Sequence, residues 1–380
     1  MKAIKKYAAV ALLGLSAVAI SSCSEEKLGP SIFPEVDETL DPNSSTYKFD
    51  KWLNQTYREP YNLDFLYRME DVGTNMNYNL VPANYEQSVD LAVLCKYLWF
   101  DVYNKIAGEE FLKQYGPRIL HLVGSPAMNA ISGTEIVGLA EGGVKVTLFK
   151  VNDLDVNNIA GLNELYFKTM HHEFAHILHQ TKTIPVTFRT YSAGFYDGSN
   201  WQSRDSRLLN SQGFVTPYAS SAVREDFAET IANYIVQPDW WWANIYDMAS
   251  RGWATDGDPQ NPDATYYCYY YYDNNVAGDE NLKYVPISGV VTETDEQGNV
   301  VYYVGRLTDS DGNRIVAYPV QDDDEIDGVA IINQKIEDAR QWMRTEFNVD
   351  LDKLREEVQA RQQNYLEQFK AIRAEIENMQ

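Results

Sequence analysis

The feature that most constrains this chain is a short histidine-rich run, His171-His172-Glu173-Phe174-Ala175-His176-Ile177-Leu178-His179. His172 and His176 are four residues apart, so on an α-helix they lie one turn apart on the same face, with Glu173 beside them. Two imidazoles at this H-E-x-x-H spacing can hold one zinc ion, and the carboxylate can activate a water molecule. The run therefore predicts a helix that carries a zinc-dependent hydrolytic site.

Apolar residues predict the extent of this helix, from about residue 161 to 180. They recur every three or four positions and form one stripe, which consists of Phe167, Met170, Phe174, Ile177 and Leu178. His172 and His176 fall on roughly the opposite side of such a helix. The helix can therefore pack into a core and still present its histidines to a ligand. The alternative is a helix whose histidines lie on the surface and bind no metal.

Two histidines leave a hydrolytic zinc site one protein ligand short. His179 is on the same face as His172, but about 10 Å farther along a straight helix, whereas zinc–nitrogen bonds are about 2 Å long. No histidine follows His179 in the sequence, so we expect a carboxylate as the third ligand. A second amphipathic helix, from about residue 222 to 236, supplies Glu225, Asp226 and Glu229. Glu225 and Glu229 lie one turn apart, opposite its apolar stripe, and Asp226 lies farther round.

The two helices, with H-E-F-A-H followed by E-D-F-A-E, resemble those of gluzincin metallopeptidases. The resemblance implies that Glu225 is the third zinc ligand and that Glu229 orients a zinc-bound histidine. The spacing from His176 to Glu225 is closer to that of anthrax-lethal-factor-like peptidases than to that of thermolysin. Those peptidases place an oxyanion-stabilising tyrosine seven residues before the ligand glutamate, and Tyr218 has that position here. The alternatives are a solvated helix face for the glutamates and a purely structural Tyr218.

The fold that the pattern and the resemblance predict is α+β and gluzincin-like. We expect a zincin catalytic domain over residues 47 to 250, with a small mixed sheet, the active-site helix and the ligand helix. Three short β-like segments precede the active-site helix, and the last, at residues 144 to 151, is expected to present its edge to an extended peptide, as in gluzincins.

The remainder of the chain predicts two further segments. Residues 251 to 328 are rich in Asp, Gly, Asn and Tyr, and turns at 297–299 and 311–313 separate alternating apolar stretches, which indicates a β-hairpin insertion. Residues 329 to 380 are predicted to be helical. Their packing stripe, directed at the domain or at a partner helix, consists of Leu354, Val358, Tyr365, Phe369, Ile372 and Ile376.

The N-terminus predicts export and lipidation. Lysines precede an apolar run from residue 8 to 20, which is typical of a signal peptide over residues 1 to 22 and is too short to span a bilayer comfortably. Ser21-Ser22-Cys23 resembles a bacterial lipobox, which implies that Cys23 is the acylated first residue; the alternative is a free cysteine. Residues 23 to 46 suit a tether, and their acidic start resembles the surface-export signal of Bacteroidetes lipoproteins. We therefore expect an outer-membrane lipoprotein exposed at the cell surface.

The signal, H-H-E-F-A-H-I-L-H-Q and T-P-Y-A-S-S-x-x-x-E-D-F-A-E together resemble the zinc-binding metallopeptidase lipoproteins of Bacteroidetes. The resemblance covers most of the mature chain. It implies zinc-dependent hydrolysis of peptide bonds in a peptide or protein substrate. Such lipoproteins are usually linked to TonB-dependent nutrient importers, so it also implies a transporter complex as a partner.

Charge and cysteine content limit the functions that this chain can have. The net charge of −23 argues against nucleic acid as a partner, because binding it requires clustered cations. Cys95 and Cys268 could form one disulfide bond.

The alternative function is an accessory glycan- or substrate-binding lipoprotein with a structural or vestigial zinc site. In that case Trp240-Trp241-Trp242 and the aromatic run from Tyr266 to Tyr272 would be stacking platforms.

Overall fold

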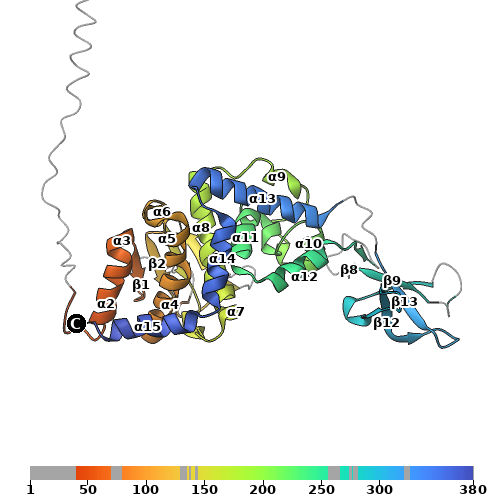
Figure 1. Cartoon of the computed structure of the whole chain (residues 1–380), viewed down its shortest axis with the longest axis horizontal. Coiled ribbons are helices and arrows are strands. Elements are labelled where there is room, and N and C mark those ends of the chain that lie inside the picture. Colours follow the sequence, from red (N-terminus) through yellow and green to blue (C-terminus); the bar gives the residue numbers. More distant parts are fainter. Residues whose placement is uncertain are drawn as a thin grey trace, which may run out of the picture. The chain divides into compact units, whose positions relative to one another are not determined.

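The computed structural model describes residues 40–69, 79–128, 135–136, 138–141, 144–255, 266–273, 276, 281–320 and 326–379. The predicted signal peptide, Cys23 and the predicted tether up to residue 39 lie outside the described residues. The chain divides into two units, Met1–Tyr47 and Lys48–Gln380, and every candidate site residue described below belongs to the second. Helices and small sheets together make the fold α+β, as the sequence predicts (Figure 1).

Helices occur before, between and after the strands along the sequence. The α-helices are α2 Tyr47–Leu53, α3 Glu59–Tyr61, α4 Tyr85–Cys95, α5 Asp101–Ala107, α6 Glu109–Tyr115, α7 Ile159–Leu162, α8 Lys168–Thr181, α9 Phe188–Tyr191, α10 Ser206–Ser211, α11 Val223–Val236, α12 Asp239–Ala249, α13 Gly328–Phe347, α14 Leu351–Gln362 and α15 Tyr365–Glu377. Among the described residues, no helix is both long enough and apolar enough to cross a bilayer.

A four-stranded sheet precedes α8 and has the order β1-β2-β6-β5. Its strands are β1 Asp64–Leu66, β2 Ile119–Leu122, β5 Gly138–Glu141 and β6 Lys145–Leu148. The first three in this order run parallel, and β5 is antiparallel to β6. The prediction that residues 144 to 151 offer a free edge is therefore wrong, because β6 pairs on both sides. The edge strands are β1 and β5, and β5 contacts α8.

A five-stranded antiparallel sheet has the order β10-β9-β13-β12-β11. Its strands are β9 Tyr269–Tyr272, β10 Leu282–Val285, β11 Val290–Thr294, β12 Val300–Thr308 and β13 Arg314–Pro319. The two predicted hairpin turns join β11 to β12 and β12 to β13. Gly298 and Gly312 have φ of 87° and 82°, a conformation that favours glycine. Asp295 and Asp309 stabilise these turns by accepting backbone N–H groups two and four residues later.

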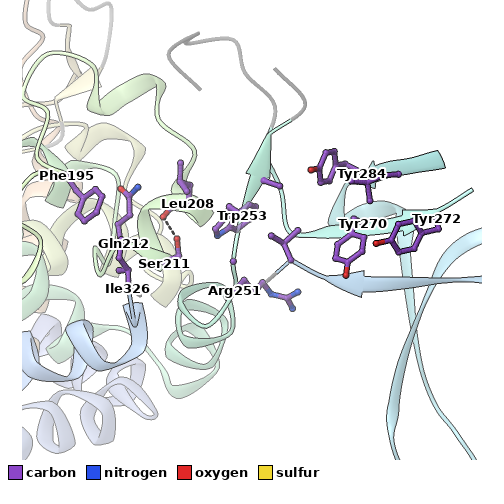
Figure 2. Close-up of a pocket in the computed structure, with 14 residues that line it drawn as sticks. Phe195, Leu208, Ser211, Gln212, Arg251, Trp253, Tyr270, Tyr272, Tyr284 and Ile326 are labelled. Atoms are coloured by element: carbon purple, nitrogen blue, oxygen red, sulfur yellow. Dashed lines mark hydrogen bonds between the residues drawn. The ribbon is translucent and has the colours of Figure 1, made fainter. Parts of the chain in front are cut away.

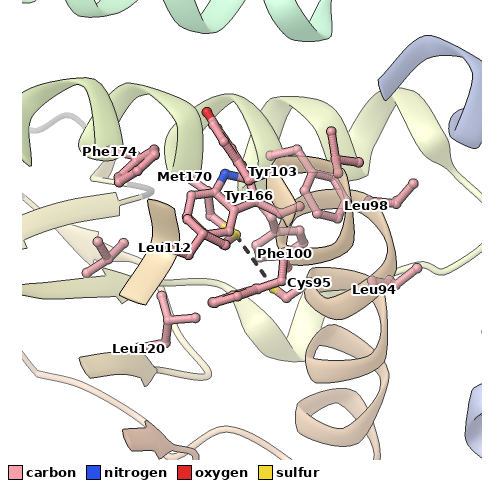
Figure 3. Packing of buried hydrophobic residues seen from close by; sticks show 14 of the residues in the cluster. Leu94, Cys95, Leu98, Phe100, Tyr103, Leu112, Leu120, Tyr166, Met170 and Phe174 are labelled. Carbon is pink, nitrogen blue, oxygen red and sulfur yellow. Dashed lines mark hydrogen bonds between the residues drawn. The ribbon is translucent and has the colours of Figure 1, made fainter. Parts of the chain in front are cut away.

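The largest hydrophobic core joins segments from both ends of the second unit. Figure 3 shows Met170 and Phe174 of α8 packed near Cys95 and Tyr103, and the sulfur atoms of Cys95 and Met170 are 3.5 Å apart. Cys95 and Cys268 are both buried and free. All six residues of the predicted C-terminal stripe are buried in this same core, so the stripe packs against the domain. The stripe is divided between α14 and α15.

The three consecutive tryptophans begin α12 and do not form one exposed platform. Trp242 is buried in a second core, and Trp241 packs against that core. Trp240 is 71% exposed. The expectation of a stacking platform over Trp240 to Trp242 is wrong for the last two, because successive helical residues point in directions about 100° apart.

Candidate metal centre

The active-site helix is continuous with the two helical turns before it. α7, a π-helical turn at Asn163–Phe167 and α8 follow one another without a gap, close to the predicted range of 161 to 180. All five residues of the predicted apolar stripe are buried. His171 also belongs to the packed interior, where its Nδ1 is 3.0 Å from the Tyr103 hydroxyl and burial lowers its pKa to about 3. The helix therefore keeps His171 neutral and leaves its other histidines for the site.

The ligand helix, α11, packs directly against α8 (Figure 1). Ala228 and Ala232 are fully buried, and their small side chains permit this close approach. Glu225 and Glu229 are only 7% and 1% exposed, so they are buried between elements and do not form a solvated face. Buried carboxylates need partners, because desolvation of an unpaired charge costs several kcal/mol.

Three side chains from the two helices converge on one point. His176 Nε2 lies 3.0 Å from His172 Nε2 and 2.9 Å from Glu225 Oε2. His172 Nε2 lies 3.3 Å from the same Glu225 oxygen. All three candidate ligand atoms are thus within 4.8 Å of one another. The structure brings together the three predicted ligands, although His176 and Glu225 are 49 positions apart in the sequence.

Glu229 holds the opposite nitrogen of His172. Its Oε1 lies 2.8 Å from His172 Nδ1, while its Oε2 accepts a hydrogen bond of 2.7 Å from Thr216 Oγ1 and lies 3.6 Å from Lys168 Nζ. Burial opposes ionisation of Glu229, but Lys168 and His172 outweigh it and hold the pKa of Glu229 below its usual range. The 2.8 Å contact puts an ionised Glu229 against Nδ1 of His172, which favours a proton on Nδ1 and leaves the Nε2 lone pair for the convergence point.

His179 has the corresponding position on His176. Its Nε2 lies 2.7 Å from His176 Nδ1. Burial, followed by the neighbouring His176, lowers the pKa of His179 to about 4, so His179 is neutral and can accept the Nδ1 proton of His176. Spacing along the helix argues against His179 as a metal ligand, but this contact with His176 was not predicted. The spacing of His176 and His179 could have predicted it, since residues three apart on a helix are neighbours.

Asp226, the third acid of α11, points away from the convergence point. Its Oδ2 lies 2.6 Å from Lys335 Nζ of α13 and accepts a hydrogen bond of 2.8 Å from the Tyr196 hydroxyl. Both Asp226 and Lys335 are fully buried. The ion pair with Lys335 joins α11 to α13 and holds Asp226 away from the histidines. Glu225 is therefore the carboxylate at the convergence point.

Glu173 and Tyr218 border the same point. Glu173 is 9% exposed, and its charge contributes to raising the pKa of both His172 and Tyr218, so it lies near both. The Tyr218 ring lies 5.7 Å from the His172 ring and 4.9 Å from Trp201. Burial and then the charge of Glu225 raise the pKa of Tyr218, so the phenol keeps its proton and can donate a hydrogen bond.

The donor set fits zinc. Two imidazole nitrogens and one carboxylate oxygen, each borne by a buried or nearly buried side chain, form the usual protein ligand set of a hydrolytic zinc site, with a position left for water or substrate. The outer nitrogens of both histidines already have partners, as is typical of metal-ligating histidines. Burial lowers the pKa of His172, yet Glu225 and Glu229 outweigh it and raise that pKa to about 9. The carboxylates around His172 therefore make the electrostatic potential at the convergence point favourable for a cation.

Comparison with known proteins gives a family and a related structure. A family described as "Putative zinc-binding metallo-peptidase" matches residues 42–352. This chain belongs to that family. A crystal structure titled as a putative zinc-binding metallo-peptidase from Bacteroides caccae has 32% sequence identity and a TM-score of 0.58, over 86% of this chain and 96% of that chain. Comparison with curated proteins gives no match.

The match to the zinc-binding metallo-peptidase family includes both α8 and α11. It therefore contains the candidate ligands and the residues around them. Some of these contacts have no local sequence signal. Thr216 lies in an irregular segment, Trp201 begins a single turn of 3-10 helix, and Lys168 is one of many lysines in the sequence. Thr216 and Trp201 reach the site because the chain between α8 and α11 folds back against α11.

Proposed function

We propose that this protein is a zinc-dependent metallopeptidase of gluzincin type, in which His172, His176 and Glu225 hold the metal. The observation that carries the proposal is the convergence of these three ligand atoms within 4.8 Å from two packed helices. Zinc bound there would act as a Lewis acid that polarises the scissile carbonyl and lowers the pKa of a water molecule. Glu229 and His179 would keep the two imidazoles oriented and in the tautomer that presents Nε2.

Glu173 is the proposed general base. It directly follows a metal ligand, it is buried, and its charge acts on both His172 and Tyr218. Its carboxylate takes the proton of the attacking water and returns it to the leaving amine. Tyr218 retains its proton and is the proposed donor to the oxyanion that develops on the carbonyl.

The substrate in this proposal is an extended peptide. β5 is at the edge of the four-stranded sheet, runs antiparallel to β6 and contacts α8. An extended chain added to this edge forms backbone hydrogen bonds independent of its sequence. Its scissile bond would then lie beside the helix that carries the histidines.

The proposed location is the outer face of the outer membrane, with a lipid anchor at Cys23 and a role beside a TonB-dependent nutrient importer. Support for this part comes from the charged, apolar and small-residue regions of the first 23 residues and from the resemblance to import-linked lipoproteins. A surface peptidase in that place would cleave peptides or proteins before import.

The test is cleavage of a proteome-derived peptide library by zinc-loaded mature protein, read by mass spectrometry. Glu173→Gln should keep zinc and the fold but lower the rate by about 100-fold to 10,000-fold, because the general base is lost. Glu164→Gln is the matched control, since Glu164 is exposed on the same helical stretch, and it should cleave normally. Equal cleavage by wild type and Glu173→Gln would exclude Glu173 as the base. A zinc-loaded wild type that cleaves nothing across the library would indicate a structural zinc site.

A further inference from the structure

A row of tyrosines spans the neighbouring strands β10, β9 and β13 on one face of the five-stranded sheet. Tyr284 of β10 and Tyr318 of β13 are both directly opposite Tyr270 of β9, and Tyr272 is two residues along the same strand. Residues opposite one another in antiparallel strands, and residues two apart in one strand, project from the same face. The Tyr270 and Tyr318 rings are stacked, with centroids 5.6 Å apart. Tyr272 is 46% exposed.

The sheet does not need this row for its own packing. The other face holds a small core of Cys268, Tyr269, Val285 and Ala317. Arg251 connects that face to the helices, because its guanidinium donates to the Tyr269 hydroxyl and forms two bonds, of 3.0 and 2.8 Å, with Asp247 of α12. Arg251 therefore links the sheet to α12, and it also borders the space beside the tyrosine row.

Three tyrosines of this row, Tyr270, Tyr272 and Tyr284, line one wall of a cleft of about 550 Å³, which is within the usual size range of ligand sites. Figure 2 shows Tyr270, Tyr272 and Tyr284 on the sheet side, and Phe195 and Gln212 on the helical side. Trp253 lies between the two walls and adds a further aromatic ring. Such a density of rings in one cleft suits a ligand with flat apolar faces.

The polar groups of the cleft are neutral. Arg251 is the single charged side chain among the described residues that line it, and Asp247 neutralises that charge. The hydroxyls of Tyr270, Tyr272 and Tyr284 have no hydrogen-bond partner among the described residues. Gln212 accepts a bond of 2.8 Å from Arg204 through Oε1, which leaves its amide nitrogen as a donor. Neutral donors and acceptors beside aromatic rings suit a ligand that is rich in hydroxyl groups and carries no charge.

From this geometry we propose that the cleft between the tyrosine row and the helical wall binds a neutral glycan. Sugar rings have apolar C–H faces that stack on tyrosine and tryptophan, and their hydroxyls can pair with phenol, amide and hydroxyl groups at the ring edges. An ionic ligand is disfavoured, because no unneutralised charge lines the described part of the cleft. The site is separate from the metal centre, since none of its described lining residues is a candidate ligand or catalytic group.

The test is affinity electrophoresis of the full mature chain in gels that contain starch, dextran, xylan or galactomannan, with polygalacturonate as the charged comparison. We expect retardation by at least one neutral polysaccharide and none by polygalacturonate. Trp253→Ala and Tyr272→Ala should each weaken binding about tenfold through loss of a stacking ring. Tyr272→Phe, which keeps the ring and loses the hydroxyl, should have a smaller effect. Trp240→Ala is the matched control, because Trp240 is 71% exposed and does not line the cleft.

Two further measurements separate this proposal from the peptidase proposal. Binding should persist with a chelator and in Glu173→Gln, and circular dichroism should show that each variant is folded. The proposal is overturned by the absence of retardation in all four neutral gels, or by equal losses in Trp240→Ala and Tyr272→Ala. It is also overturned if uncharged aromatic peptides bind in place of glycans and lose binding in Tyr272→Ala, because the cleft would then be a peptide site.

Discussion

Lys335 Nζ lies 2.6 Å from Asp226 Oδ2 in the interior of the protein. This contact gives Asp226 a different partner from the other two acids of α11, Glu225 and Glu229. Glu225, one residue earlier, faces the two histidines, and Glu229, one turn after Glu225, holds the far nitrogen of His172. Three acids on one helix therefore have three different partners: Asp226 a buried ammonium, Glu225 the proposed metal, and Glu229 an imidazole that would bind that metal.

We expect zinc content to distinguish the three acids. Glu225→Ala should lose stoichiometric zinc, because one of three protein ligands is removed. Glu229→Ala should lower zinc affinity by about 10-fold to 100-fold, since it frees His172 from its orienting partner. Asp226→Ala, if folded, should retain zinc. Elemental analysis after dialysis measures all three, and near-normal zinc in Glu225→Ala with zinc lost in Asp226→Ala would show that the wrong acid was chosen.

Removal of Lys335 should destabilise the fold and leave the metal ligands in place. Burial raises the pKa of Asp226 and lowers that of Lys335, so each charge depends on the other. Lys335→Met should cost about 3–5 kcal/mol of unfolding free energy, because it leaves a buried carboxylate without its partner. Urea denaturation measures this cost. Lys353→Met, at an exposed lysine of α14, should change it by less than about 0.5 kcal/mol.

The double variant Asp226→Asn with Lys335→Met provides the internal check on that prediction. It removes both charges, so it should be more stable than Lys335→Met alone. A double variant that is as unstable as the sum of its single changes would contradict the ion pair as the cause.

Zinc should stabilise the folded protein, because its proposed ligands come from two helices that only the fold brings together. Thermal unfolding with excess EDTA should occur at a lower temperature than unfolding with added zinc. Free zinc at 100 times its dissociation constant contributes about 2.7 kcal/mol to stability. Glu225→Ala should show little zinc-dependent shift, and a shift as large as that of wild type would argue against Glu225 as a ligand.

Tyr218→Phe should keep zinc and lose rate. Loss of one donor to an oxyanion typically lowers kcat by about 100-fold to 1,000-fold. Tyr85→Phe is a suitable control, because Tyr85 is 37% exposed and belongs to α4 rather than to the site. The measurement is the cleavage rate of a peptide identified in the library, with zinc content measured in parallel. An unchanged kcat would remove Tyr218 from the proposed mechanism.

Acylation of Cys23 should anchor the protein in the outer membrane. Cys23→Ser should abolish incorporation of labelled fatty acid and move the processed protein out of the membrane fraction. Fractionation with immunoblotting measures the distribution. Complete retention of processed Cys23→Ser in the membrane would show that another feature provides the anchor.

Local periodicity was sufficient for the parts of the site that lie within one helix. The four-residue spacing of His172 and His176, with an apolar stripe on the other side, predicts the helix that the structure contains, because helical geometry depends only on sequence separation. The same argument predicts that Glu225 and Glu229 share one face of α11. A different local signal, glycine between two alternating apolar stretches, predicts the hairpin turns at Gly298 and Gly312, where a positive φ favours glycine.

Tertiary structure alone decided which distant elements meet. Alternation within residues 144 to 151 predicts a strand but does not specify its neighbours, so only the fold shows that β6 is interior and that β5 lies at one edge. The partner of Asp226 is Lys335, 109 positions later in the numbering, and no periodicity connects two such positions. The aromatic cleft likewise depends on how a sheet and helices pack. Sequence spacing determines the direction of a side chain on its own element, whereas burial of the shared core determines which element it faces.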